Sequence, residues 1–88
     1  MLEEQRAEID AIDREIVALF ERRMQVVVDV ARIKKENGIA ILDANREKEV
    51  IAKVQSYLKD DHLKEELAEA YETLMKVSKD YQLKQMKA

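Results

Sequence analysis

The sequence contains no cysteine, no proline and a single glycine, and each of these shortages excludes a class of protein. Without cysteine the chain can form neither a disulfide nor a thiolate site. The one histidine, His62, is too few for a histidine-based metal site, so we expect no bound metal. Turn residues and β-branched runs are too scarce for a sheet protein. The remaining class is an all-α protein.

Long apolar runs and charge of one sign are also missing. No run approaches the roughly 20 apolar residues of a membrane-spanning helix. The chain begins with the acidic segment MLEE rather than with the basic and then apolar pattern of a signal peptide. The formal net charge is −3 with both signs interleaved, so no basic stripe is available for nucleic acid. We therefore expect a cytoplasmic protein that binds neither a membrane nor nucleic acid.

What is present are the good helix formers Ala, Leu, Glu, Lys, Arg and Gln. The length of 88 residues suits a single domain, residues 1–88. Apolar residues recur at intervals of three and four, which is the helical period. Asn37-Gly38 is typical of a helix C-terminus, and Asp43 can cap the helix that follows. The pattern predicts three helices, at about residues 3–37, 44–58 and 63–86.

The first predicted helix is too long for a compact monomer. At a rise of 1.5 Å per residue it would be about 50 Å long. A compact chain of this length has a radius of gyration of roughly 12 Å. The other two helices cannot cover the whole apolar stripe of such a rod. A second copy of the chain is the simplest cover, so we expect a helical homodimer.

Several polar residues interrupt the apolar stripes. On a helical wheel Arg23 and Lys34 lie at the centre of the first stripe, and Glu47 lies close to the centre of the second. Ser78 lies inside the third stripe and Gln82 on its flank. Taken singly, such residues could extend their charged ends to water or form a buried ion pair that fixes the register of a dimer. Taken together, they predict a pocket in which cations outnumber anions, suited to an anionic ligand such as a carboxylate.

This ordered set resembles the all-helical chorismate mutases. The first helix of that family is similar to LEEQRAEIDAIDREIVALFERR, and its second-helix entry is similar to LDANREKEV. The third helix is matched only by SKDYQ, so its register depends on Ser78 and Gln82. The resemblance carries over the site residues Arg6, Arg23, Lys34, Asp43, Arg46, Glu47, Ser78 and Gln82.

The resemblance implies an intertwined homodimer with a six-helix bundle and an isomerase activity. The family reaction is the intramolecular Claisen rearrangement of chorismate, a dicarboxylate enol ether, to prephenate in phenylalanine and tyrosine biosynthesis. It implies no cofactor and no covalent intermediate. Catalysis would consist of holding the compact conformer and stabilising charge as the ether bond breaks.

The resemblance also implies a role for each residue. Arg6, from the other protomer, and Arg23 would grip the two carboxylates. Lys34 would serve a carboxylate and the ether oxygen, and Gln82 would donate a second hydrogen bond to that oxygen.

The remaining residues would hold the ring hydroxyl and complete the carboxylate shell. Glu47 and the backbone at Asp43 would bind the hydroxyl, while Ser78 and Arg46 would bind a carboxylate. Two alternatives stay open, a non-catalytic regulatory relative and a helical dimerisation module. A module that used charges only to fix its register would pair them, whereas cations are in excess here.

Overall fold

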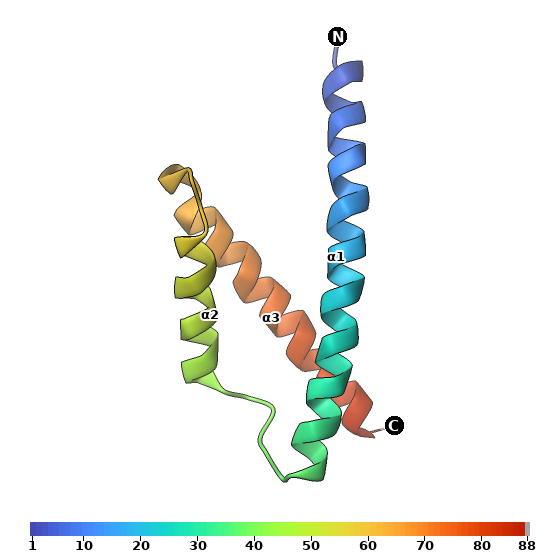
Figure 1. The fold of residues 1–88 in the computed structure, drawn as a ribbon, viewed down its shortest axis with the longest axis vertical. Coiled ribbons are helices and arrows are strands. Elements are labelled where there is room, and N and C mark those ends of the chain that lie inside the picture. The colour runs from blue at the N-terminus through green and yellow to red at the C-terminus, as the bar shows by residue number, and fades with distance from the viewer. Residues whose placement is uncertain (88) are drawn as a thin grey trace.

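The computed structural model describes residues 1–87, and this part of the chain is all-helical (Figure 1). The predicted all-α class with three helices is confirmed for these residues. A short 3-10 turn, η1, precedes the last helix. The elements in chain order are α1 (Glu3–Glu36), α2 (Ala44–Ser56), η1 (Asp61–Leu63) and α3 (Lys64–Lys87).

The end of α1 is fixed by its one glycine. Gly38 has a φ of 65°, the left-handed conformation that a side chain disfavours. This bend lets the backbone N–H of Ile39 donate to the carbonyl of Lys34 at 2.8 Å, the bond expected of a glycine-terminated helix. Lys34 therefore lies in the last turn of α1, next to the connector that leads to α2.

Aspartate side chains start the two segments that follow. Asp43 Oδ1 accepts a hydrogen bond from the backbone N–H of Arg46 at 3.0 Å, as the sequence predicts for a helix cap. Asp60 Oδ1 accepts one from the N–H of His62 at 3.0 Å and starts the 3-10 turn before α3. The second helix ends at Ser56, two residues before the expected end, because Tyr57 and Leu58 bond three residues back in a tighter turn.

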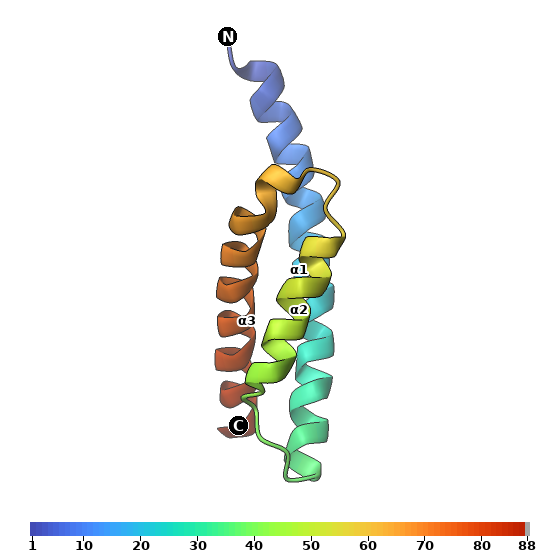
Figure 2. The ribbon, with the colours of Figure 1, turned by 90° about the vertical axis from the view of Figure 1, so that its left-hand side faces the viewer.

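The three helices form an open, elongated arrangement. Helix α3 contacts both α1 and α2, and it crosses the half of α1 that precedes the connector (Figures 1 and 2). The N-terminal turns of α1 extend past the rest of the chain. The molecule measures 54 × 27 × 15 Å with a radius of gyration of 15.9 Å. A compact chain of this length would have a radius of roughly 12 Å, so the rod is not covered.

The apolar core of the single chain is small. Only Val27, Ala31 and Met75 are buried apolar residues in the described chain, and they lie where α3 packs against α1 and α2. Every residue from Met1 to Arg22 is exposed. The predicted stripe of α1 is thus covered only in part in its second half, where Val26 and Ile33 stay exposed, and it is bare in its first half. Bare apolar residues of that first half include Ile9, Ile12, Ile16, Leu19 and Phe20.

The exposed area leads to the same conclusion. The chain exposes 7380 Å², whereas a compact globule of this mass would expose roughly 5,400 Å².

No helix within residues 1–87 has the length and apolar character of a membrane span.

Candidate functional site

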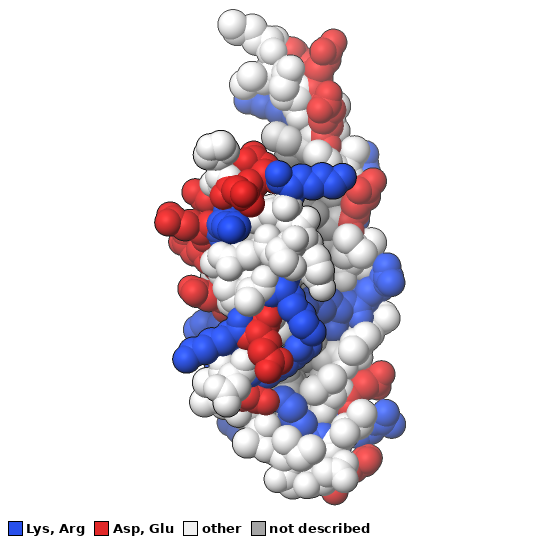
Figure 3. All heavy atoms as spheres, turned by 60° about the vertical axis from the view of Figure 1, so that its left-hand side comes forward, with Lys and Arg blue, Asp and Glu red and all other residues white. Residues whose placement is uncertain are grey.

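One cavity of about 190 Å³ collects residues from all three helices and the connector. In the space-filling view, basic and acidic side chains lie beside one another in the lower half of the molecule (Figure 3). Seven of the eight predicted site residues line the cavity, namely Arg23, Lys34, Asp43, Arg46, Glu47, Ser78 and Gln82. Its apolar walls are Val27, Val30, Ile41, Val50 and Met75. The interruptions of three separate stripes therefore meet at one place.

Arg23 and Ser78 link α1 to α3 at this cavity. Arg23 Nη1 donates a hydrogen bond to Ser78 Oγ at 2.8 Å. Ser78 Oγ lies 2.8 Å from the carbonyl of Leu74, to which it donates within its own helix. The serine is buried, while Arg23 is half-buried. The guanidinium has five N–H donors, so this bond orients it and leaves other donors for a ligand.

Lys34 lines the same cavity from the last turn of α1. Its Nζ donates to the carbonyl of Ile41 in the connector at 3.0 Å, and the side chain is half-buried. An ammonium has three donors, so two are left after this bond. Within residues 1–87, neither Lys34 nor Arg23 forms an ion pair with a carboxylate.

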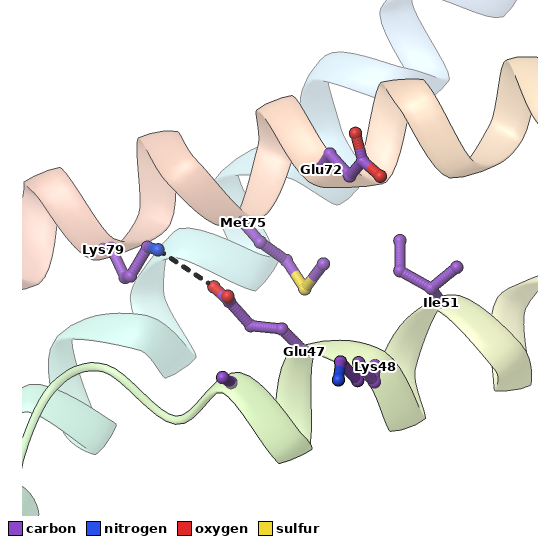
Figure 4. Close-up of a pocket in the computed structure, with 7 residues that line it drawn as sticks. Glu47, Lys48, Ile51, Glu72, Met75 and Lys79 are labelled. Atoms are coloured by element: carbon purple, nitrogen blue, oxygen red, sulfur yellow. Dashed lines mark ion pairs between the residues drawn. The ribbon is translucent and has the colours of Figure 1, made fainter.

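Glu47 meets a residue that the sequence analysis missed. Lys79 of α3 places its Nζ 3.1 Å from Glu47 Oε2 of α2, and both side chains are about one-third exposed, at 31% and 30%. Figure 4 shows the two side chains pointing toward each other from the two helices, with Met75 beside them. A lysine on an amphipathic helix usually faces solvent. The available signal was its place next to Ser78, three residues before Gln82.

Gln82 is more deeply placed than its position on the wheel indicated. It was predicted on the flank of the third stripe, yet it is 7% exposed. Crossing of α3 over α1 buries this flank as well. Its Oε1 is buried without a hydrogen-bond partner in the described chain. Leaving a buried polar atom unpaired costs roughly 1–3 kcal/mol, which favours a residue retained to meet a ligand.

Asp43 and Arg46 lie at the rim of the cavity. The Asp43 carboxylate is occupied by the cap of α2, which leaves its backbone for a ligand. Arg46 is exposed, and its Nη1 lies 3.7 Å from Glu49 Oε2. The cavity lining thus has four basic residues, Arg23, Lys34, Arg46 and Lys79, against the acidic Asp43 and Glu47.

Pairing leaves two cations for a ligand. Lys79 is paired with Glu47, and Arg46 is near Glu49. The half-buried Arg23 and Lys34 have no carboxylate partner within residues 1–87. Two unneutralised cations in one small, partly desolvated cavity suit a dianion, because desolvation strengthens the attraction of opposite charges.

Arg6 is the one predicted site residue that lies elsewhere. It is exposed on the bare half of α1 and does not line the cavity. It precedes Arg23 by 17 positions, which correspond to about 25 Å of helix, far beyond the reach of a side chain. Arg6 therefore cannot serve the cavity of its own chain.

Within the described residues, no cluster of three His, Cys, Asp or Glu side chains could hold a metal ion.

Comparison with known proteins gives one family and two relatives. The sequence profile described as chorismate mutase type II matches residues 5–83. The T-protein of Haemophilus influenzae is 33% identical over 80% of this chain, which spans only 21% of that relative. A chorismate mutase of Methanocaldococcus jannaschii is 36% identical over 75% of this chain and 67% of its own length. No solved structure matches the chain.

Proposed function

This chain belongs to the chorismate mutase type II family, and on that premise we propose that it catalyses the rearrangement of chorismate to prephenate. The observation that carries the proposal is the pair of half-buried cations, Arg23 and Lys34, facing one cavity without carboxylate partners in the described chain. A dicarboxylate would neutralise both. The buried Gln82, whose Oε1 has no partner within residues 1–87, adds a neutral amide beside them.

The proposed mechanism is positional and electrostatic. Arg23, oriented by Ser78, binds one carboxylate and selects the compact conformer of the substrate. Lys34 uses its remaining donors for a carboxylate and for the ether oxygen, which gains negative charge as its bond to carbon breaks. The Gln82 amide donates to the same oxygen. No proton transfer or covalent intermediate is required.

The ring hydroxyl is proposed to lie against α2. The Glu47 carboxylate accepts a hydrogen bond from the hydroxyl, and the backbone at Asp43 contributes to the same contact. Both residues line the cavity at the start of α2. Arg46 at the rim and Ser78 at the base complete the carboxylate shell.

We also propose that two chains intertwine into a six-helix bundle. The bare apolar residues on the first half of α1 support this, as does the excess exposed area of roughly 2,000 Å² over a compact globule. Two chains would have roughly 4,000 Å² of such excess, which lies within the 2,000–5,000 Å² that obligate homodimers commonly bury in total. In such a dimer Arg6 would reach the cavity of the other protomer and bind the second carboxylate. The cytoplasmic location stays a prediction.

The activity is tested by the loss of chorismate absorbance on addition of the purified protein. We expect turnover by the chain without metal or cofactor, and Arg23→Ala should abolish it. The alternative, a non-catalytic regulatory or dimerisation module, is supported less well, because the charges of the cavity are not fully paired. Binding of chorismate without its consumption would favour that alternative and contradict the proposed activity.

Complementation tests the shared site. Arg6→Ala and Arg23→Ala should each be inactive alone and should regain about a quarter of wild-type activity when mixed at equal amounts, because half of the dimers then carry one intact site of two. Sedimentation at micromolar concentration should give the mass of two chains. No recovery after confirmed subunit exchange would mean that Arg6 does not complete the other protomer's site.

A further inference from the structure

The ion pair between Glu47 and Lys79 lies where two cavities meet. The cavity of about 190 Å³ shares both side chains and Met75 with a neighbouring hollow of about 420 Å³ between α2 and α3 (Figure 4). The pair is the one link of opposite charges between α2 and α3 in residues 1–87. The pair therefore fixes the position of the Glu47 carboxylate at the edge of the candidate site.

The orientation and the charge balance of the Glu47 carboxylate both depend on Lys79. The Glu47 carboxylate has two oxygens, and Oε2 is occupied by Lys79 Nζ at 3.1 Å. This leaves Oε1 as the free acceptor and fixes the direction in which it points. Without Lys79, Glu47 would have no ion-pair partner within residues 1–87, and its charge would weaken the attraction of the cavity's other cations for a dianionic ligand.

We propose that Lys79 is a positioning residue that acts through Glu47, an inference that rests on the proposed function. It orients the Glu47 carboxylate toward the ring hydroxyl of the substrate and cancels its negative charge. A stability role is insufficient as an explanation, because an ion pair this exposed contributes little to folding. Lys79 thus determines how well the site accepts a hydroxylated dicarboxylate.

The test is a double-mutant cycle between Lys79→Met and Glu47→Gln. Lys79→Met should lower kcat/KM roughly tenfold, through a lower kcat from misorientation and a higher KM from repulsion. In the Glu47→Gln background the same change should cost less than about twofold, because the group on which Lys79 acts has been replaced. Lys79→Arg keeps the charge and should restore most of the activity.

Lys76→Met is the matched control. Lys76 lies on the same helix and pairs with Asp80 at 3.1 Å, but it is exposed and outside both cavities. This variant should keep wild-type kinetics, and all variants should melt close to wild type. Equal losses from Lys79→Met in both backgrounds would show that Lys79 contacts the substrate itself and would overturn the inference, as would an unchanged kcat/KM. An inactive wild-type chain would instead overturn the proposed function, and with it this inference.

Discussion

Replacing Lys34 with methionine should lower kcat by roughly 10²–10³, the scale of a lost oxyanion donor, while the fold survives. Methionine has nearly the same length and fits the apolar stripe that Lys34 interrupts. The half-buried ammonium is placed to stabilise charge on the ether oxygen, which methionine cannot do. The loss should therefore fall on the chemical step.

The melting temperature of Lys34→Met should change little or rise. Removing a partly desolvated cation is favourable. The variant also loses the hydrogen bond to the Ile41 carbonyl, which typically contributes about 0.5–1.5 kcal/mol and offsets that gain. Lys34 is in this view retained for the reaction, at no benefit to stability.

Lys35→Met is the control for this experiment. Lys35 is the next residue of α1, but it is exposed, and its Nζ lies 3.3 Å from the carbonyl of Met86, away from the site. Chorismate consumption at saturating substrate gives kcat for both variants, and thermal unfolding followed by circular dichroism gives stability. Near-normal turnover in Lys34→Met would remove this residue from the mechanism.

Most of the candidate site could be predicted from the sequence because charged residues stand where apolar ones are expected. Arg23 and Lys34 broke the stripe of the first helix, and Glu47 broke that of the second. The structure places all three around one cavity. Periodicity could reveal them because the helical period relates sequence position to a face of the helix.

Periodicity could not reveal what depends on helix crossing. By its position in the sequence Lys79 is expected at the surface. Its pairing with Glu47 depends on how α2 packs against α3. The sequence places Gln82 on the flank of its stripe, and it is the crossing of α3 over α1 that buries it. The end of α2 at Ser56 likewise depends on a local turn without a glycine or proline to signal it.

Changing Gln82 to glutamate should make the reaction depend on pH. The wild-type amide does not titrate and presents a donor N–H at any pH. The rate of the wild-type protein should therefore be nearly flat across neutral pH. The variant keeps the size of the side chain, but an ionised carboxylate has only acceptors. It would also repel the ether oxygen as that oxygen gains charge. At pH 7 we expect a rate lower by about 10², comparable to the loss of one oxyanion donor.

Lower pH should rescue Gln82→Glu, because the protonated carboxyl group regains a donor O–H. Burial at this position raises the pKa of the introduced carboxyl, while Lys34 and Arg23 lower it. These opposing effects set where the rise in rate occurs, but its direction is fixed, since only the protonated form can donate. The rate should therefore increase as pH falls through that pKa.

Gln85→Glu separates this effect from a general effect of added charge. Gln85 lies on the same helix, is half-buried and is outside the candidate site, so the same chemical change there should leave the profile flat. The measurement is kcat/KM from about pH 4.5 to 8 for wild type and both variants, with circular dichroism to verify the fold. A Gln82→Glu profile parallel to wild type would mean that Gln82 does not contact the ether oxygen. The register assigned to α3 from Ser78 and Gln82 would then be wrong.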